Sequence, residues 1–131
     1  INMVFGGQLR LVGYDIPQWQ ANQPVDTVTV RLVWQSVGQG QQNLTRFVHV
    51  VNREGAPKLW GQSDSHPLAG AYPTSLWREG EFVSETVWMP LNPEAMVINQ
   101  PYLLHVGFYD PETGQRLLTE TGQDHIEIAV P

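Results

Sequence analysis

The sequence predicts an all-β protein, a two-sheet antiparallel β-sandwich of the jelly-roll or immunoglobulin-like type with about seven to nine strands. Three observations lead to this fold. Apolar and polar residues alternate with a period of two along most of the chain, as in strands with one buried face. Glycine and proline recur between these segments, where turns are needed. No stretch shows the longer period of an amphipathic helix.

The first half of the chain contains four expected strands. Residues 3–5 and 9–16 form a first strand in two pieces. The clearest alternation is at 28–34, followed by 44–51, which is apolar enough for a central position, and by a short strand at 59–62. The expected buried face of the second strand consists of Val28, Val30, Leu32 and Trp34.

The second half adds strands at 82–89, 102–109 and 125–130, with a short one at 116–118. Alternation again predicts which side chains point inward. They are Tyr102, Leu104, Val106 and Phe108 in one strand and Ile126, Ile128 and Val130 in the last. The large residues Trp34, Phe47 and Phe108 are the candidate anchors of the core between the two sheets.

The connections contain residues that favour turns. Segments 52–55 and 110–114 both end in glycine, which suits the left-handed position of a hairpin turn. In segment 92–96, Asn92 can cap a single helical turn that has Pro93 in its first position.

Composition excludes several classes of protein. The chain has 131 residues, which fits one domain spanning residues 1–131. Seven basic against 13 acidic residues give a net charge of −6, so the basic surface of a nucleic-acid-binding protein is missing. There is no cysteine, which excludes disulfides, thiolate zinc sites and cysteine nucleophiles. Five tryptophans, four tyrosines and four phenylalanines argue against disorder.

No apolar run approaches the roughly 20 residues that a membrane-spanning helix needs, so we expect no direct membrane insertion by this segment. The sequence starts at Ile1 rather than at methionine, so we expect it to be a fragment of a longer polypeptide.

Residues 64–80, DSHPLAGAYPTSLWREG, form the most informative segment. The segment has no strand or helix period, and structureless loops longer than about 12–15 residues tend to be functional or disordered. A flexible linker would be poor in aromatic residues, whereas this one contains two. The residue types suit a sugar, with aromatic rings for stacking and polar groups for its hydroxyls. The candidate ligand-binding residues are Asp64, His66, Tyr72, Trp77 and Arg78.

The same loop has a structural interpretation. Tyr72 and Trp77 can instead plug the open end of the sandwich, with Asp64 capping a turn and Pro67 and Pro73 stiffening the loop. The discriminating property is exposure, because buried rings cannot stack on a sugar.

Other chemistry finds little support in the residue spacing. The four histidines, at 49, 66, 105 and 125, form no H-x-H or H-x-x-x-H pair, so no metal site is predicted. His49 and His105 are expected to be hydrogen-bonded strand residues. A structural Ca²⁺ at Asp110, Glu112 and Thr113 lacks the usual loop pattern, and an ordinary turn is expected there.

A catalytic site is equally unsupported. Asp64 could be paired with Glu79 or Glu85 as in a glycoside hydrolase, but nothing in the spacing brings them together. The G-x-S-x-G motif of serine hydrolases is missing. We therefore expect a protein that is not an enzyme and needs no cofactor.

A series of motifs resembles a known family. The motifs are L-x-L-V-G-Y-D-I (9–16), V-x-L-V-W (30–34), F-V-H-V-V-N-x-x-G (47–55), D-x-x-P-L-A-G-x-Y-P-T-S-x-W-x-x-G-E (64–81) and Y-x-L-H-V-G-F-Y-D-P-x-T-G-x-R-L (102–117). Together they resemble the extracytoplasmic β-sandwich domain at the C-terminus of bacterial multi-pass membrane proteins that are similar to lipid-linked-sugar glycosyltransferases of the mannosyltransferase type. The resemblance covers most of the chain. It implies a β-sandwich on the extracytoplasmic face of a membrane, but no activity.

Three functions remain open from the sequence, and the third of them, a glycoside hydrolase, would need two close carboxylates in a cleft. The first is a non-catalytic extracytoplasmic module that binds carbohydrate or assists a membrane glycosyltransferase-like protein. The second is a structural or protein-interaction domain that packs on the membrane-embedded part of its own polypeptide or on a partner. Exposed apolar side chains elsewhere, with Trp19 and Trp60 as candidates, would favour the second.

Overall fold

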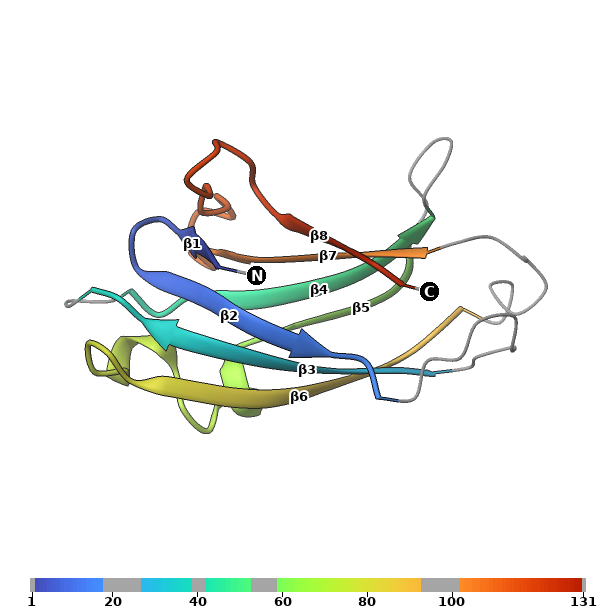
Figure 1. Ribbon diagram of the computed structural model, residues 1–131, viewed down its shortest axis with the longest axis horizontal. Helices are drawn as coiled ribbons and strands as arrows, with labels where there is room; N and C mark the ends of the chain where they lie inside the picture. The colour runs from blue at the N-terminus through green and yellow to red at the C-terminus, as the bar shows by residue number, and fades with distance from the viewer. Residues whose placement is uncertain (1, 18–26, 39–41, 53–58, 93–101, 131) are drawn as a thin grey trace.

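The fold is a β-sandwich of two four-stranded antiparallel sheets, as predicted (Figure 1). The computed structural model describes residues 2–17, 27–38, 42–52, 59–92 and 102–130. Sheet A has the strand order β1-β2-β3-β6 and sheet B the order β5-β4-β7-β8. The strands are β1 (Met3–Phe5), β2 (Leu9–Asp15), β3 (Thr27–Ser36), β4 (Thr45–Asn52), β5 (Leu59–Ser65), β6 (Phe82–Pro90), β7 (Tyr102–Tyr109) and β8 (Ile126–Ala129). Within these ranges no helix is long and apolar enough to cross a bilayer.

The strand order matches the immunoglobulin-like alternative. Strands β2, β3 and β6 take the places of strands A, B and E in one sheet, while β5, β4, β7 and β8 take those of C′, C, F and G in the other. Each sheet therefore contains strands from both halves of the chain. The strand 44–51, expected to be central, is confirmed as such, since β4 lies between β5 and β7.

The core lies between the sheets and follows the predicted alternation. In β3 every second residue is buried, from Val28 to Ser36. In β7 and β8 the predicted inward residues are all buried. Trp34 and Phe108 are confirmed as core anchors, with ring centroids 4.7 Å apart and Phe5 packed edge-on against both.

Phe47 is buried, as expected, but it does not lie in the core between the two sheets. The side chain is fully buried but lies outside the core cluster. It is directly opposite Gly107 on β7, and a Cβ on Gly107 would come within 2.6 Å of the ring. The two inward neighbours of Phe47 on β4 are Arg46 and Val48, so the ring itself belongs to the outer face of sheet B.

Three expected elements either differ from the structure or lie largely outside the described residues. Segment 116–118 is not a strand, because Arg116 bridges only to Tyr109 and the following Thr119 only to Phe5. The segment thus crosses from β7 to β1 and cannot form a ladder with either. The turn at 52–55 and the helical turn at 92–96 fall largely on 53–58 and 93–101, outside the described residues.

A buried ion pair joins the two sheets. Arg46 on β4 contacts the Glu85 carboxylate on β6, with guanidinium nitrogens 3.1 Å from Oε1. Trp34 Nε1 donates to Glu85 Oε2 at 2.9 Å, and Arg46 also donates to the Ser63 carbonyl oxygen at 2.8 Å. Both charged side chains are almost completely buried. Every polar group of the pair thus has a hydrogen-bond or ion-pair partner, as a buried charge requires.

Candidate functional site

The loop at 64–80 is fastened to the body of the sandwich. It contains two short 3₁₀ turns, η1 (Pro67–Gly70) and η2 (Thr74–Leu76). The buried Thr74 hydroxyl accepts a hydrogen bond from the Leu44 N–H at 2.8 Å and donates to the Gln42 carbonyl at 2.6 Å. The tip of the loop is therefore tied to the segment that leads into β4.

The two aromatic rings of the loop face the protein. Trp77 is only 4% exposed and belongs to the core cluster, and its Nε1 donates to the Tyr72 carbonyl at 2.9 Å. Tyr72 is half-buried, packs against that cluster and donates its hydroxyl hydrogen to Glu81. The ring centroids of the two residues are 6.2 Å apart. Since Trp77 is buried and Tyr72 packs against the core cluster, the geometry favours the structural interpretation of these two residues.

The other three predicted ligand-binding residues do not join the rings. Asp64 lies opposite Phe47 on the outer face of sheet B, where its carboxylate is 2.9 Å from His49 Nε2. His66 Nδ1 is 3.1 Å from the Leu44 carbonyl oxygen, so it holds the loop to the strand entry. Arg78 is exposed at the end of the loop. Ligand binding by these residues stays a prediction, but the two aromatic rings that were expected to stack on the sugar face the protein instead.

The contact between Tyr72 and Glu81 predicts a pH dependence of stability. The hydrogen bond from Tyr72 lowers the pKa of Glu81 below its ordinary value of 4.5, because the ionised carboxylate is the better acceptor. The native state thus binds this proton less readily than the unfolded chain does. The resulting stability is present above about pH 4.5 and is lost as the pH falls through the lower native pKa. We expect the difference in urea midpoint between wild type and Tyr72→Phe to shrink from about pH 6 to about pH 3. A constant difference would contradict a role for this carboxylate.

A second cluster covers the outer face of sheet B. The Phe47 ring stacks against Tyr109, with ring centroids 6.1 Å apart, and the Arg116 guanidinium lies 4.2 Å from the Phe47 centroid. His49 packs on the other side, with centroids 5.0 Å apart. Phe47 fills the space that the missing side chain of Gly107 leaves open. This is why an aromatic ring on an outer face is fully buried.

Gly107→Ala should therefore destabilise the fold by about 1–3 kcal/mol, because a methyl group would displace the Phe47 ring from its neighbours. Gly13→Ala is the matched control in another strand, since its Cβ would meet nothing within 4 Å. Urea unfolding of both variants measures the difference. Equal midpoints for the two alanine variants would show that the ring can move aside freely.

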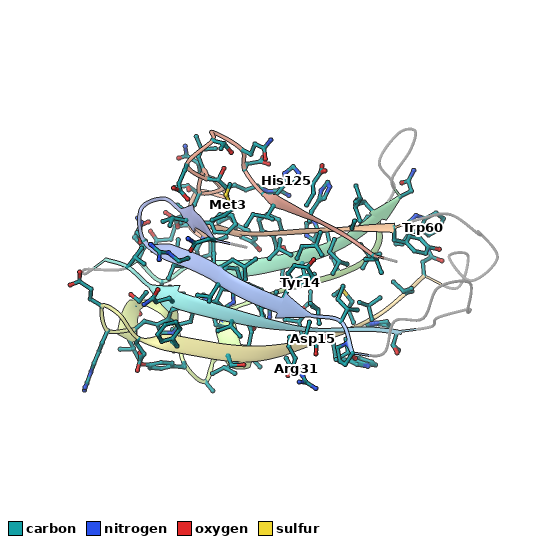
Figure 2. The ribbon with its side chains drawn as sticks, viewed as in Figure 1. Met3, Tyr14, Asp15, Arg31, Trp60 and His125 are labelled. Carbon is teal, nitrogen blue, oxygen red and sulfur yellow. The ribbon has the colours of Figure 1, made fainter. Side chains whose placement is uncertain are left out.

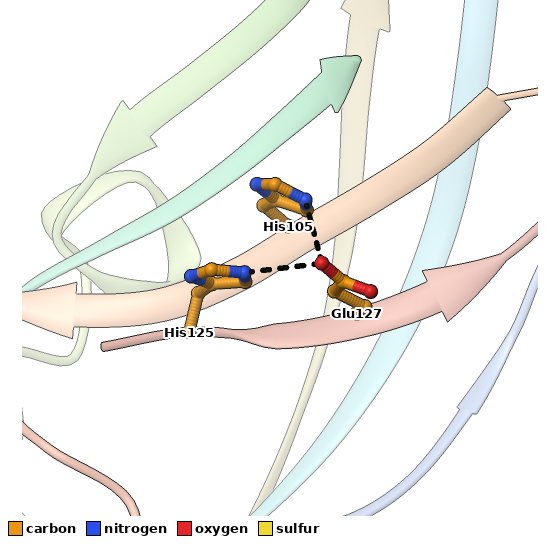
Figure 3. A group of neighbouring side chains, drawn as sticks. All are labelled: His105, His125 and Glu127. Atoms are coloured by element: carbon orange, nitrogen blue, oxygen red, sulfur yellow. Dashed lines mark ion pairs between the residues drawn. The ribbon is translucent and has the colours of Figure 1, made fainter. Parts of the chain in front are cut away.

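Three potential metal ligands converge at the edge of this cluster. His105 on β7 pairs with Glu127 on β8, and His125 precedes β8 on the same face (Figure 3). Both histidine Nε2 atoms are 3.5 Å from Glu127 Oε1, and one ligand atom from each residue lies within 4.8 Å of the others. The imidazole rings stack with centroids 4.0 Å apart. Burial, and then the neighbouring His125, lower the pKa of His105, which favours its neutral, metal-binding form.

Histidine spacing alone did not predict this convergence. His105 and His125 are distant in sequence and meet only because β7 and β8 pair antiparallel in the observed register. One local signal was present, since His125 and Glu127 are two residues apart in an expected strand and so share a face. His49 is hydrogen-bonded to Asp64, as expected, at 2.9 Å. The contact of His105 is instead an ion pair with Glu127 at 3.5 Å.

The outer face of sheet A has a different character. On β6 the outward residues are exposed, and Phe82 and Trp88 are 62% and 60% accessible. Trp88 pairs with Thr29 on β3, and the next outward pair is Thr86 with Arg31. Arg31 in turn forms an exposed ion pair with Asp15 at 3.7 Å (Figure 2). Of the two other tryptophans considered as exposed candidates, Trp60 is buried and Trp19 lies outside the described residues.

The proposed carboxylate pair of a hydrolase does not form from Asp64 and Glu85. Asp64 is on the outer face of sheet B, whereas Glu85 is between the sheets and bound to Arg46. In the 110–114 turn, Asp110 Oδ1 accepts a hydrogen bond from the Glu112 N–H at 2.9 Å and the Thr113 hydroxyl accepts one from the Gln115 N–H at 3.2 Å. These are the contacts of an ordinary turn.

Comparison of the chain with protein-family models, with curated proteins and with solved structures finds no match. The resemblance to the extracytoplasmic domain of glycosyltransferase-like membrane proteins stays a prediction from its sequence motifs.

Proposed function

We propose that this β-sandwich is a non-catalytic, extracytoplasmic interaction module that docks on another protein segment through the outer face of β6. The observation that supports this is the distribution of aromatic rings. Trp77 in the loop is buried, whereas Phe82 and Trp88 are the most exposed aromatic side chains of the described residues and lie on one face of one strand. Large exposed apolar side chains on a shared face are typical of interaction surfaces.

The spacing of the two rings suits a protein better than a single sugar. Phe82 and Trp88 are six positions apart, which is about 20 Å along a strand. A protein interface of about 800 Å² per partner spans both rings, whereas one sugar ring stacks on one of them. Strand β6 is also an edge of sheet A and pairs, among the described strands, only with β3. An edge strand leaves backbone groups available to a partner.

The partner implied by the sequence resemblance is the membrane-embedded part of the same polypeptide. The test is a photo-crosslinking amino acid placed at 88, at 82 and, as a control, at the solvent-facing Thr121, in cells that make the protein at its natural length. We expect crosslinks to a hydrophobic segment of the same chain from 88 and 82 and none from 121. Absence of crosslinks from both aromatic positions would overturn the docking proposal.

Carbohydrate binding is the second candidate function, with Trp88 in place of the loop as the proposed binding site. The indole of Trp88 is exposed beside Thr29, and Thr86 and Arg31 form the adjacent pair, so a ring face and polar groups occur together. A glycan array followed by titration calorimetry distinguishes the two functions. Saccharide binding that is lost in Trp88→Ala but kept in Phe82→Ala would support the carbohydrate function.

A further inference from the structure

The strongest unassigned feature is the cluster of His105, His125 and Glu127 on the outer face of sheet B (Figure 3). It lies on the sheet opposite the proposed docking face, and neither proposed function uses it. One imidazole is on β7 and the other immediately precedes β8, yet both direct Nε2 at the same carboxylate oxygen. Two imidazole nitrogens with one carboxylate oxygen form a ligand set typical of zinc.

We propose that His105, His125 and Glu127 bind a zinc ion, with water completing the coordination. Zinc bonds of 2.0–2.1 Å in a tetrahedron place neighbouring ligand atoms about 3.3 Å apart. The two nitrogen-to-oxygen distances in the cluster are 3.5 Å, close to that separation. The two histidines are partly exposed and Glu127 is exposed, so these side chains can rotate to bring their ligand atoms around the ion.

A carboxylate behind one ligand supports the same assignment. His125 Nδ1 lies 2.7 Å from Asp124 Oδ1, which leaves Nε2 as the nitrogen directed at the site. Metal-binding histidines commonly donate their second nitrogen to a carboxylate in this manner, which fixes the tautomer and the ring orientation. Arg116 lies 3.5 Å from the same Asp124 oxygen and restrains it. The outer contacts that a histidine ligand needs are thus already in place.

The position of the site indicates what zinc would do. Strand β8 is only four residues long and forms the edge of sheet B, where β7 is its sole neighbour among the described strands. His105 is on β7, while the other two ligands belong to β8 and the residue before it. Zinc would therefore fasten the last strand to the sheet, and we assign it a structural role.

Titration of the chelator-treated protein with ZnCl₂, by calorimetry and by thermal unfolding, tests the proposal. We expect one bound ion per chain and a melting temperature that rises with zinc concentration. Asp124→Asn should weaken binding about 10–100-fold, as expected for an outer carboxylate. Glu127→Gln should weaken it at least as much, and it changes an exposed side chain, so folding is not at risk.

Glu112→Gln is the matched control, since it makes the same change at an exposed carboxylate outside the cluster. Its zinc affinity should equal that of the wild type. Co²⁺ provides a second readout, because it absorbs strongly in the visible range when four-coordinate, and that absorption should disappear in His125→Gln. Failure of the wild type to bind zinc, or an unchanged affinity in Glu127→Gln, would overturn the proposal.

Discussion

Glu85→Ala is expected to lower the free energy of unfolding by about 3–5 kcal/mol, the usual effect of breaking a buried ion pair. The substitution leaves the Arg46 guanidinium in the core without its carboxylate and deprives Trp34 Nε1 of its acceptor. Arg46 is held by its bond to the Ser63 carbonyl and is almost fully buried, so it cannot easily reach water. Urea denaturation followed by tryptophan fluorescence measures the loss.

Removing both charges tests the physical reason. Arg46→Met combined with Glu85→Leu should be less destabilising than Glu85→Ala alone, because no unpaired charge remains in the interior. Glu79→Ala, an exposed carboxylate at the end of the loop, should change stability by less than about 0.5 kcal/mol. A double variant that is much less stable than the single one would show that the pair contributes net stability rather than only compensating for burial.

The two-sheet fold was predictable because period-two alternation is a local property of the sequence. The alternating residues of β3 and β7 reveal their inward faces without any knowledge of their neighbours. The alternation does not reveal the inward face of β4, because this strand has buried apolar side chains on both faces. The burial of the Phe47 ring follows only from the strand register, which places it opposite Gly107, and from its contacts with Tyr109 and Arg116.

The buried ion pair and the histidine cluster also depend on register and on sheet packing. Arg46 and Glu85 are 39 residues apart and meet across the two sheets, which no local pattern reveals. The alternation in β6 does indicate that Glu85 is buried, since it falls on the inward face between Val83 and Val87. A lone acidic residue on an apolar face predicts a buried cationic partner, although not which one.

The burial of Trp77 in the loop at 64–80 could not be derived from composition. Aromatic residues in a long loop are equally suited to binding and to packing. Which of the two applies depends on Thr74. The hydrogen bonds of its hydroxyl group with Leu44 and Gln42 tie the loop to the sandwich and orient Trp77 inward. A threonine between proline and serine offers no signal of that anchoring in the sequence.

Trp77→Ala is expected to lower the free energy of unfolding by about 3–5 kcal/mol, as for other large aromatic residues removed from a core. The side chain is 4% exposed, and its indole N–H bonds to the Tyr72 carbonyl, which would lose its partner. Chemical denaturation measures the change, and the fluorescence of the remaining tryptophans reports the transition.

Leu76→Ala is the matched control, because this neighbour in the same loop is 62% exposed. Its effect should stay within about 0.5 kcal/mol, since little apolar surface is exposed anew. A Trp77→Ala variant as stable as Leu76→Ala would mean that the indole does not close the sandwich, and the loop would regain its place as a binding surface. A large loss of stability in Trp77→Ala alone assigns the ring to the core. Removal of a side chain that only contacts a ligand would leave the free energy of unfolding nearly unchanged. Stability of the unliganded protein thus separates the two interpretations of the loop before any ligand is known.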